Sequence, residues 1–530
     1  MATYNLLKEP WIPVVRTDGT ETLMNLPEVL RDAHLLREVR DPLPIVEFGL
    51  YRLLTACVID CFRLEGRNAL ARLLTAGHFP VDKLDAYFDT WQDRFDLFHP
   101  HYPFLQTAEM GAEKAEPLAR LLPHIPAGIN VTHFHHAGQE AFGVCPAAAA
   151  RLLTTVAPFM TAGGPGMSPS VNGAPPWYVL VRGANLFETL CMNCPTPLPS
   201  GISTLGVPAW RAEEPVEARR YTEISLLQAL TWQPRRIRLV PGESGQCTIT
   251  GIETPMLVRT MKFTAGAMCD FTWRDPAVPY KITDKGPLVL RPLEGRELWR
   301  DTGPLALLRE KEYHSERNVA YERPLLVTQA DDCINRRALG STERTLELLV
   351  YGMRTDLKMK VFEWQREQLS LSPALIRQGA QGGAAQQEME RAEQVEWGLK
   401  SAITHAYPRD GKSNTHAFEH RIADARQQFW AALRDDFTLL LQALAELPTG
   451  EEREEAHAAC LATWRARVSD AGRQALEAAI DDLDTDGKAL QRLVEARERF
   501  HRVAWVALHP EMIREKRARR QQTAPKGVTV

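Results

Sequence analysis

The chain has 530 residues, of which 44% are hydrophobic and 25% are charged, and its formal net charge is -4 at pH 7. This composition is typical of a globular protein, and the length exceeds what one hydrophobic core normally serves, so we expect two or more domains. The negative net charge argues against a protein that covers its whole surface with nucleic acid, but it does not exclude local basic surfaces.

The N-terminal residues and the cysteines indicate where the protein works. The segment from Met1 to Pro10 carries Lys8 and Glu9 and lacks the apolar region of a secretion signal, and no run approaches the roughly 18 uncharged apolar residues of a membrane span. The nine cysteines are an odd number in a chain without such a signal, which argues against a disulfide framework. We therefore expect a cytoplasmic protein that contacts no membrane.

Two runs in the N-terminal part combine aromatic residues with prolines, Asn5 to Val14 and Phe95 to Gln106. Proline fixes φ and removes a backbone donor, so we expect both runs to form rigid, buried turns instead of helices or strands. A near-continuous apolar run at residues 45–62 predicts a helix, and residues 177–181 and 237–240 predict strands. Together with Gly- and Pro-rich loops, this mixture indicates one large, irregular α+β domain.

The composition changes after this domain. Gln, Gly and Ala dominate the next stretch, which we expect to be a linker or an exposed loop. Beyond it, apolar residues recur at steps of three and four, as Leu490 and Leu493 do, and short breaks separate four such helices, which predicts a four-helix bundle. The predicted divisions are 1–365 for the α+β domain, 366–387 for the linker, 388–518 for the bundle and 519–530 for a basic tail.

Motifs for catalysis and for zinc are incomplete. Residues 411–413, Gly-Lys-Ser, resemble the end of a phosphate-binding loop, but Ala406 stands where that motif needs its first glycine. No His-Asp dipeptide and no zinc-protease helix motif occurs, which argues against a nuclease or a protease. Cys191 and Cys194 have the spacing of zinc ligands, yet a second pair is missing.

Three segments are candidate binding surfaces. The Thr-His-Phe-His-His run at residues 132–136 is open to three interpretations: a metal site, a surface loop, or a contact with nucleic acid or a partner. Consecutive imidazoles point in different directions, which counts against the metal. The basic run at residues 235–238 and the basic C-terminal tail are candidates for contact with phosphates, although such a tail can also be a solvated helix end.

The two aromatic and proline runs, in this order and at this separation, closely resemble the large subunit of the type I-E CRISPR surveillance complex Cascade, the CasA family. The similarity extends from about Asn5 to Lys358 and continues into the bundle as architecture. It implies a DNA-reading subunit that is not an enzyme and has no cofactor or resident metal. The partners it implies are double-stranded target DNA and its displaced strand, the 5′ end of the guide RNA, the backbone and small subunits of the complex, and a helicase-nuclease.

The resemblance also implies how DNA is read. In that family a glycine-rich loop approaches the minor groove of the protospacer-adjacent motif, a short duplex tag, and its match is Gly163 and Gly164. A lysine enters the groove, and its match is Lys262. Because the minor groove offers a degenerate pattern of donors and acceptors, such a reader is expected to accept several related tags.

A wedge on a hairpin is the third element implied by the resemblance, and it separates the first base pair of the target. Its match is Asp356, Leu357 and Lys358. Many relatives have a polar amide where Leu357 stands and an asparagine where Asp356 stands, but apolar wedges serve other minor-groove proteins. Asp356 near phosphates needs neutralisation by Lys358 or Arg354.

A mobile loop of the family carries an exposed aromatic to the backbone subunit and the guide RNA, and its match is Phe134, His135 and His136. This favours the nucleic-acid interpretation of the histidine run. Several relatives also have a cysteine pair at Cys145 and a second group near Cys247; one cysteine of each survives here, which implies that packing, and not zinc, holds this region.

Two other functions are compatible with the sequence. One is a metal-dependent hydrolase built on four histidines, namely His99, His101, His133 and His135. The other is a pure scaffold subunit that does not touch DNA, for which Lys262 would be freely replaceable.

Overall fold

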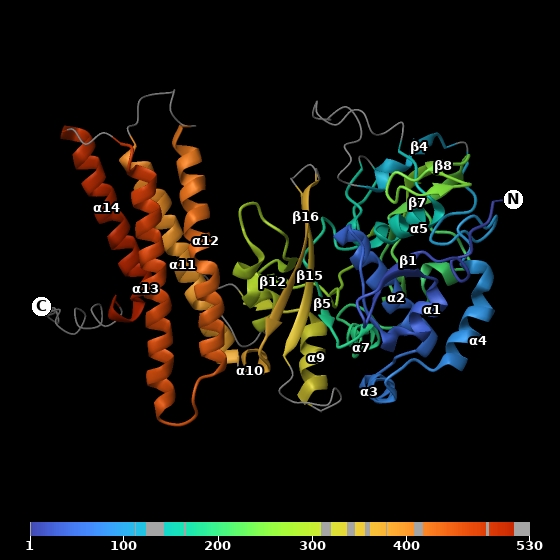
Figure 1. Ribbon diagram of the computed structural model, residues 1–530, viewed down its shortest axis with the longest axis horizontal. Helices are drawn as coiled ribbons and strands as arrows, with labels where there is room; N and C mark the ends of the chain where they lie inside the picture. Colours follow the sequence, from blue (N-terminus) through green and yellow to red (C-terminus); the bar gives the residue numbers. More distant parts are fainter. Residues whose placement is uncertain are drawn as a thin grey trace, which may run out of the picture. The chain divides into compact units, whose positions relative to one another are not determined.

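The computed structural model describes ten stretches of the chain, and it divides into two compact units (Figure 1). One, here called the α+β unit, comprises Met1–Leu298, Pro304–Ala306 and Val319–Pro373, and the other, the helical unit, comprises Trp299–Gly303, Leu307–Asn318 and Ala374–Val530. The described residues are 2–111, 113–122, 142–163, 166–308, 320–335, 345–355, 361–377, 379–407, 417–483 and 487–513.

The two aromatic and proline runs lie side by side in the α+β unit. The backbone N–H of Leu6 donates to Phe95 (2.9 Å), and that of Leu97 donates to Tyr4 (2.9 Å). Trp11 and Phe104 are fully buried, with ring centroids 6.4 Å apart. The predicted burial is therefore confirmed for these residues. Residues 12–14, however, belong to a strand and not to a turn, because their backbone pairs with two neighbouring strands.

A single buried helix organises this unit. The helix α2 (Pro44–Phe62) confirms the predicted helix at 45–62, and it is apolar nearly all round, as expected of a helix surrounded by protein. At Gly49 a Cβ would lie 2.5 Å from Oγ1 of Thr154, so glycine lets α5 approach closely. The other α-helices of the unit are α1 (Leu26–Arg31), α3 (Arg67–Ala76), α4 (Val81–Trp91), α5 (Pro146–Thr154), α6 (Val156–Phe159), α7 (Leu186–Met192), α8 (Leu226–Leu230) and α9 (Leu325–Asn335).

The strands form small sheets instead of one large one. The three-stranded sheets have the orders β2-β1-β3, β4-β10-β7, β13-β12-β14 and β16-β15-β5, and two further pairs are β11-β6 and β8-β9. The strands are β1 (Ile12–Arg16), β2 (Glu21–Met24), β3 (Leu36–Val39), β4 (Ala115–Pro117), β5 (Tyr178–Arg182), β6 (Arg220–Tyr221), β7 (Arg235–Pro241), β8 (Gly245–Gln246), β9 (Glu253–Thr254), β10 (Val258–Ala265), β11 (Met268–Cys269), β12 (Tyr280–Thr283), β13 (Gly286–Val289), β14 (Ala320–Glu322), β15 (Leu346–Thr355) and β16 (Val361–Leu371).

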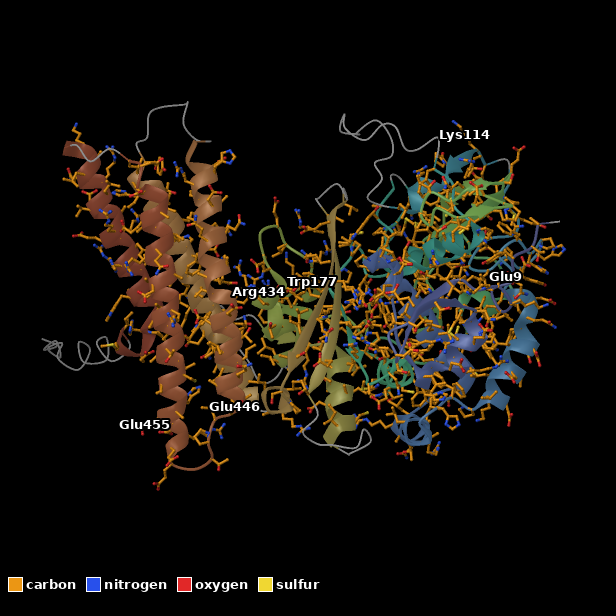
Figure 2. All side chains as sticks on the ribbon, in the orientation of Figure 1. Glu9, Lys114, Trp177, Arg434, Glu446 and Glu455 are labelled. Atoms are coloured by element: carbon orange, nitrogen blue, oxygen red, sulfur yellow. The ribbon has the colours of Figure 1, made fainter. Side chains whose placement is uncertain are left out.

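The longest strands, β15 and β16, form an antiparallel hairpin that Figure 1 shows clearly. Trp177, labelled in Figure 2, is buried against it, since a Cβ on Gly352 of β15 would lie 2.3 Å from the indole ring. Short 3-10 or π turns connect the elements: η1 (Ala33–Leu35), η2 (Gln92–Arg94), η3 (Leu118–Leu121), η4 (Ala209–Arg211), η5 (Leu298–Asp301) and η6 (Gly303–Leu307).

The helical unit contains four long helices that run lengthwise beside one another (Figure 1). Apolar residues at the predicted three- and four-residue steps are buried, for example Phe429, Leu433 and Leu440, which confirms the α+β fold with a C-terminal four-helix bundle. Leu490 is an error of the sequence-based prediction, because it lies in the first turn of its helix and is 47% exposed, whereas Leu493 is buried. The helices are α11 (Gly379–Ala406), α12 (Ala417–Ala445), α13 (Glu452–Ile480) and α14 (Gly487–Leu508), preceded by α10 (Pro373–Arg377).

The predicted linker at 366–387 is not a linker. It contains the end of β16, the helix α10 and the first turns of α11. Ala and Gln favour helix, and the glycines serve close packing instead of flexibility. A Cβ on Gly382 would lie 3.0 Å from Cβ of Leu307, and one on Gly303 would lie 2.2 Å from Oε1 of Gln386. The small residues therefore let the segment around residue 303 lie directly on α11.

Two further findings concern the whole described chain. The predicted basic tail at 519–530 lies outside the described residues. Of the helices that the described stretches contain, none combines the length and the hydropathy needed to cross a membrane.

Candidate nucleic-acid interface

Three cations share the more exposed face of the β4-β10-β7 sheet. In the antiparallel register Lys262 of β10 lies opposite Arg238 of β7, and Thr264 lies opposite Arg236. Because side chains alternate along a strand, these positions point away from the face that buries Met261 and Ile237. Like charges placed opposite each other in a sheet are destabilising, so this arrangement costs stability unless an anion lies nearby.

Carbonyl oxygens, and not carboxylates, hold these cations. Nζ of Lys262 donates to the carbonyl oxygens of Met110 and Gly111, each at 2.8 Å. Arg238 donates to the carbonyl of His99 (3.0 Å), and Arg236 donates to that of Ala265 (3.1 Å).

A carbonyl fixes the direction of a cation without cancelling its charge. Within the described stretches, none of the three cations forms an ion pair with a carboxylate. Burial lowers the pKa of Arg238, while the charge of Asp96 acts in the opposite direction. The positive face is therefore oriented but largely uncompensated. In the following paragraphs it is called the basic sheet face, defined as Arg236, Arg238 and Lys262.

Gly163 lies near the opposite, buried face of this sheet, where Arg235 of β7 points. Its N–H donates to the carbonyl of Met167 (3.1 Å). A Cβ at this position would lie 3.0 Å from Sδ of Met167 and 3.2 Å from a guanidinium nitrogen of Arg235, which is tighter than most real contacts. Gly164 lies outside the described residues.

Arg235 fastens this glycine loop to the sheet. It is only 2% exposed, and it donates to the carbonyls of Thr161 (2.8 Å) and Ser168. Burial lowers its pKa to about 10, so the guanidinium stays charged at neutral pH. The sequence-based interpretation of residues 235–238 as a basic surface is thus wrong for Arg235, because strand alternation turns it into the interior.

The structure thereby brings two predicted site residues to one sheet. Gly163 contacts Arg235 of β7, and Lys262 stands on the adjacent strand β10, next to Phe263, whose ring lies 5.7 Å from the Arg235 guanidinium carbon. The chain separation between them is large, and only the sheet pairing connects them. Arg236 and Arg238 were not predicted as site residues individually; the signal that could have found them is their i, i+2 spacing on a predicted strand.

The wedge residues Asp356, Leu357 and Lys358 fall between β15 and β16, outside the described residues. On the described side of the hairpin, Nε of Arg354 donates to Glu363 (2.9 Å), across a bulge in the strand pairing. Arg354, one of the two residues predicted to neutralise Asp356, thus has a carboxylate partner on the facing strand. The predicted loop residues also lie outside the described residues, namely Phe134, His135 and His136.

The histidines of the alternative hydrolase do not form a metal site where they are described. Nδ1 of His99 accepts the backbone N–H groups of His101 (3.2 Å) and Tyr102 (2.9 Å), so this nitrogen serves a turn. His133 and His135 lie outside the described residues. In the parts of the chain that the structure covers, no group of three or more His, Cys, Asp or Glu side chains could hold a metal ion.

The four cysteines considered as possible zinc ligands lie in two places. Cys191 and Cys194 lie at the end of α7, where burial raises the pKa of both thiols. Cys145 and Cys247 are neighbours, and a hydrogen bond between their side chains raises the pKa of Cys145 and lowers that of Cys247 to about 4. Two sulfurs alone fall short of the four ligands of a structural zinc site.

Comparison with known proteins identifies the family. The model of the family described as CRISPR-associated protein Cse1 matches residues 5–505. The chain is 28% identical to CRISPR-associated protein CasA/Cse1 of Thermus thermophilus over 524 residues, which cover 94% of this chain and 97% of that protein.

Solved structures agree with this result. The structure of Thermus thermophilus CasA (Cse1) matches with a TM-score of 0.70 and 26% identity, covering 94% of this chain and 99% of that one. A chain of a CRISPR RNA-guided surveillance complex has the same fold, with a TM-score of 0.70 and 20% identity, covering 94% of this chain and 100% of that one. The chain therefore belongs to the Cse1 family, the CasA proteins of type I-E CRISPR systems.

Proposed function

We propose that this protein is the large, non-catalytic subunit of an RNA-guided type I-E surveillance complex and that it recognises the protospacer-adjacent motif through the minor groove. The single observation that carries the proposal is the basic sheet face, whose cations are held by carbonyl oxygens on a sheet that contacts Gly163 through Arg235 on its opposite face. Family membership and the surveillance-complex chain of the same fold support the assignment to such a complex.

The geometry of Lys262 suits minor-groove recognition. Its ammonium group has three N–H donors, and two of them are used by Met110 and Gly111, so one is left for an acceptor on a base edge. Arg236 and Arg238 add charge on the same face, which suits contact with phosphates. Acceptors in the minor groove are degenerate, so the protein is expected to accept several related motifs.

Recognition would then lead to strand separation. In this proposal Leu357 enters the first base step as an apolar wedge, and Lys358 neutralises Asp356. The target sequence itself is read by pairing with the guide RNA, which forms the R-loop and releases the displaced strand. Phe134, His135 and His136 would contact the 5′ end of the guide RNA or the backbone subunit, the bundle would pack on the small subunits, and the assembly would recruit the helicase-nuclease.

Assembly followed by motif discrimination tests the proposal. The affinity-tagged chain, expressed in a cell that carries the remaining subunits and a CRISPR transcript, should co-purify with a short guide RNA and several smaller proteins. The purified complex should bind a matched duplex with the motif at least tenfold more tightly than the same duplex with the motif scrambled. A chain that purifies alone, or a complex that binds both duplexes equally, would contradict it.

A nuclease assay separates this function from the hydrolase alternative. The isolated chain, incubated with single- and double-stranded DNA and with Mg²⁺, Mn²⁺ or Zn²⁺, is expected to leave both substrates intact. Metal-dependent cleavage that is lost in His99→Ala would favour the hydrolase.

A further inference from the structure

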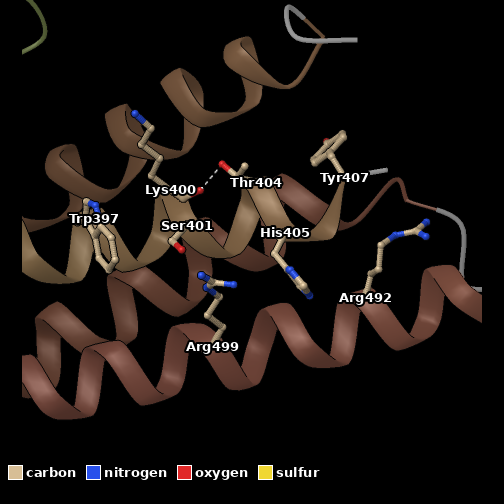
Figure 3. A pocket seen from close by; sticks show the side chains of 8 residues that line it. All are labelled: Trp397, Lys400, Ser401, Thr404, His405, Tyr407, Arg492 and Arg499. Atoms are coloured by element: carbon tan, nitrogen blue, oxygen red, sulfur yellow. Dashed lines mark hydrogen bonds between the residues drawn. The ribbon is translucent and has the colours of Figure 1, made fainter. Parts of the chain in front are cut away.

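An open groove of about 570 Å³ lies between α11 and α14 in the helical unit (Figure 3). Trp397 of α11 stands at one end of this groove, and its side chain is 63% exposed. The next residue, Gly398, brings the two helices together, since a Cβ there would lie 2.7 Å from a methyl group of Val503. A large indole therefore projects beside a tightly packed helix pair instead of entering the core.

Two arginines of α14 line the same groove. Arg492 and Arg499 are seven residues apart, which is close to two helical turns, so they lie on the same side of α14. Neither forms an ion pair within the described residues, and the buried Nε of Arg492 has no hydrogen-bond partner there. By contrast, Arg497 of the same helix is bound to Glu477 at 2.6 Å.

None of the residues that line the groove is a carboxylate. The nearby Glu495 of α14 forms a hydrogen bond with His405 of α11 (2.8 Å). Figure 3 shows His405 and Arg499 pointing into the space between the two helices from opposite sides, while Lys400 lies at the rim with its ammonium group directed away from α14. The groove thus combines one exposed aromatic ring with two guanidinium groups that form no ion pair within the described residues.

We propose that this groove binds single-stranded nucleic acid, with a base stacked on Trp397 and backbone phosphates on Arg492 and Arg499. Stacking on an open aromatic ring requires an unpaired base, which a duplex does not offer, and cations without carboxylate partners are suited to phosphates. In this proposal Trp397 contacts the face of a base and the two arginines contact phosphates. Because base edges are not read, binding is insensitive to sequence. The identification of this strand as the one displaced from the target rests on the proposed function. The proposal of a single-strand site in the groove does not.

The test uses the full chain and a fluorescently labelled oligothymidylate of about 20 nucleotides, with anisotropy measured at several salt concentrations. Trp397→Ala should weaken binding about tenfold or more, and Trp397→Phe should restore most of it, because a phenyl ring also stacks. Arg492→Ala and Arg499→Ala should each lower the slope of log K against log salt by about 0.7, the value expected for one lost phosphate contact. All these side chains are at least partly exposed, so the variants should melt like the parent.

Two controls make the result specific. Arg434 is an exposed arginine of α12, labelled in Figure 2, that does not line the groove. Arg434→Ala removes one positive charge, as Arg499→Ala does, but it should leave the salt dependence of oligonucleotide binding unchanged. Lys262→Ala should bind the oligonucleotide like the parent even where motif binding is lost, which keeps this site distinguishable from the proposed function.

Four results of the oligonucleotide binding assay would overturn the proposal. They are an oligonucleotide that does not bind the parent chain, a Trp397→Ala variant that binds it like the parent, an Arg434→Ala effect equal to that of Arg499→Ala, and loss of binding in Lys262→Ala alone. A competition experiment with poly-glutamate of the same total charge as the oligonucleotide adds a further test. If the peptide displaces the oligonucleotide and Trp397→Ala does not change the peptide's affinity, the groove binds an acidic protein segment, which would also overturn the proposal.

Discussion

The interior of the helical unit and the basic sheet face treat positive charge in opposite ways. In the helical unit Glu388 is only 1% exposed, and it accepts hydrogen bonds from Arg391 and from Arg465, the latter at 2.8 and 3.1 Å. On the sheet face Lys262 and Arg238 bind carbonyl oxygens and keep their charge. A buried charge pair makes the fold depend on both partners, whereas a charge that carbonyl oxygens only orient is available to a ligand.

The largest expected effect concerns Glu388. Glu388→Gln removes the buried carboxylate that Arg391 and Arg465 share, although Arg465 keeps Glu511 at 2.8 Å. Breaking a buried charge pair in this way typically costs about 3 kcal/mol. Chemical denaturation of the full chain should show this loss in the transition of the helical unit, while binding at the basic sheet face should be unchanged once the protein is folded.

An exposed pair is the matched control for that experiment. Glu477 and Arg497 are both about 40% exposed, so Glu477→Gln should change the stability by less than about 1 kcal/mol. Equal losses in the two variants would show that burial does not distinguish the charge pairs of this unit.

Lys262→Ala should give the opposite result. A specific contact in the groove is worth about 1–3 kcal/mol, so the assembled complex should bind motif-bearing targets roughly ten- to a hundredfold more weakly, with guide-RNA assembly intact. The stability of the chain should fall only slightly, through the lost bonds to Met110 and Gly111. Unchanged target binding in the complex would remove Lys262 from the interface.

Phe134→Ala tests a contact with RNA or a subunit. Stacking of an aromatic ring on a base contributes about 1–3 kcal/mol, so the variant should dissociate more readily from the assembled complex in a gel-filtration or pull-down assay. The melting temperature of the isolated chain should not change. A large decrease in that temperature would mean that the ring belongs to the core of the protein.

The smallest expected effect is that of Leu357→Gly on the rate of R-loop formation on supercoiled DNA. Separating the first base pair costs a few kcal/mol, and an inserted side chain offsets that cost, so the variant should form R-loops slowly on relaxed DNA. Negative supercoiling assists unwinding and should restore most of the rate, with affinity for the motif duplex nearly constant. An equal defect on relaxed and supercoiled templates, or none on either, would show that Leu357 is not the wedge.

The sequence by itself determined the elements whose residues act locally. The apolar run at 45–62 predicted α2, and the spacing of Phe429, Leu433 and Leu440 predicted the bundle, because a helix brings residues three and four apart onto one face whatever surrounds it. The aromatic and proline runs carried enough information to indicate the family. Of the predicted motif-reading residues, the structure describes Gly163 and Lys262. Gly163 contacts strand β7, and Lys262 lies on the paired strand β10.

The tertiary structure alone decided what depends on distant partners. Arg235 is buried because β7 pairs with β10 and because its guanidinium group binds the carbonyl oxygens of Thr161 and Ser168. A four-residue basic run does not reveal which of its members faces inward. Glycines near residue 382 pack α11 against a segment some 75 residues earlier, so their flexible composition was misleading. Lys262 lies directly across from Arg238 because of the register between β10 and β7. That register is set by contacts between residues far apart in the sequence, which a local pattern does not reveal.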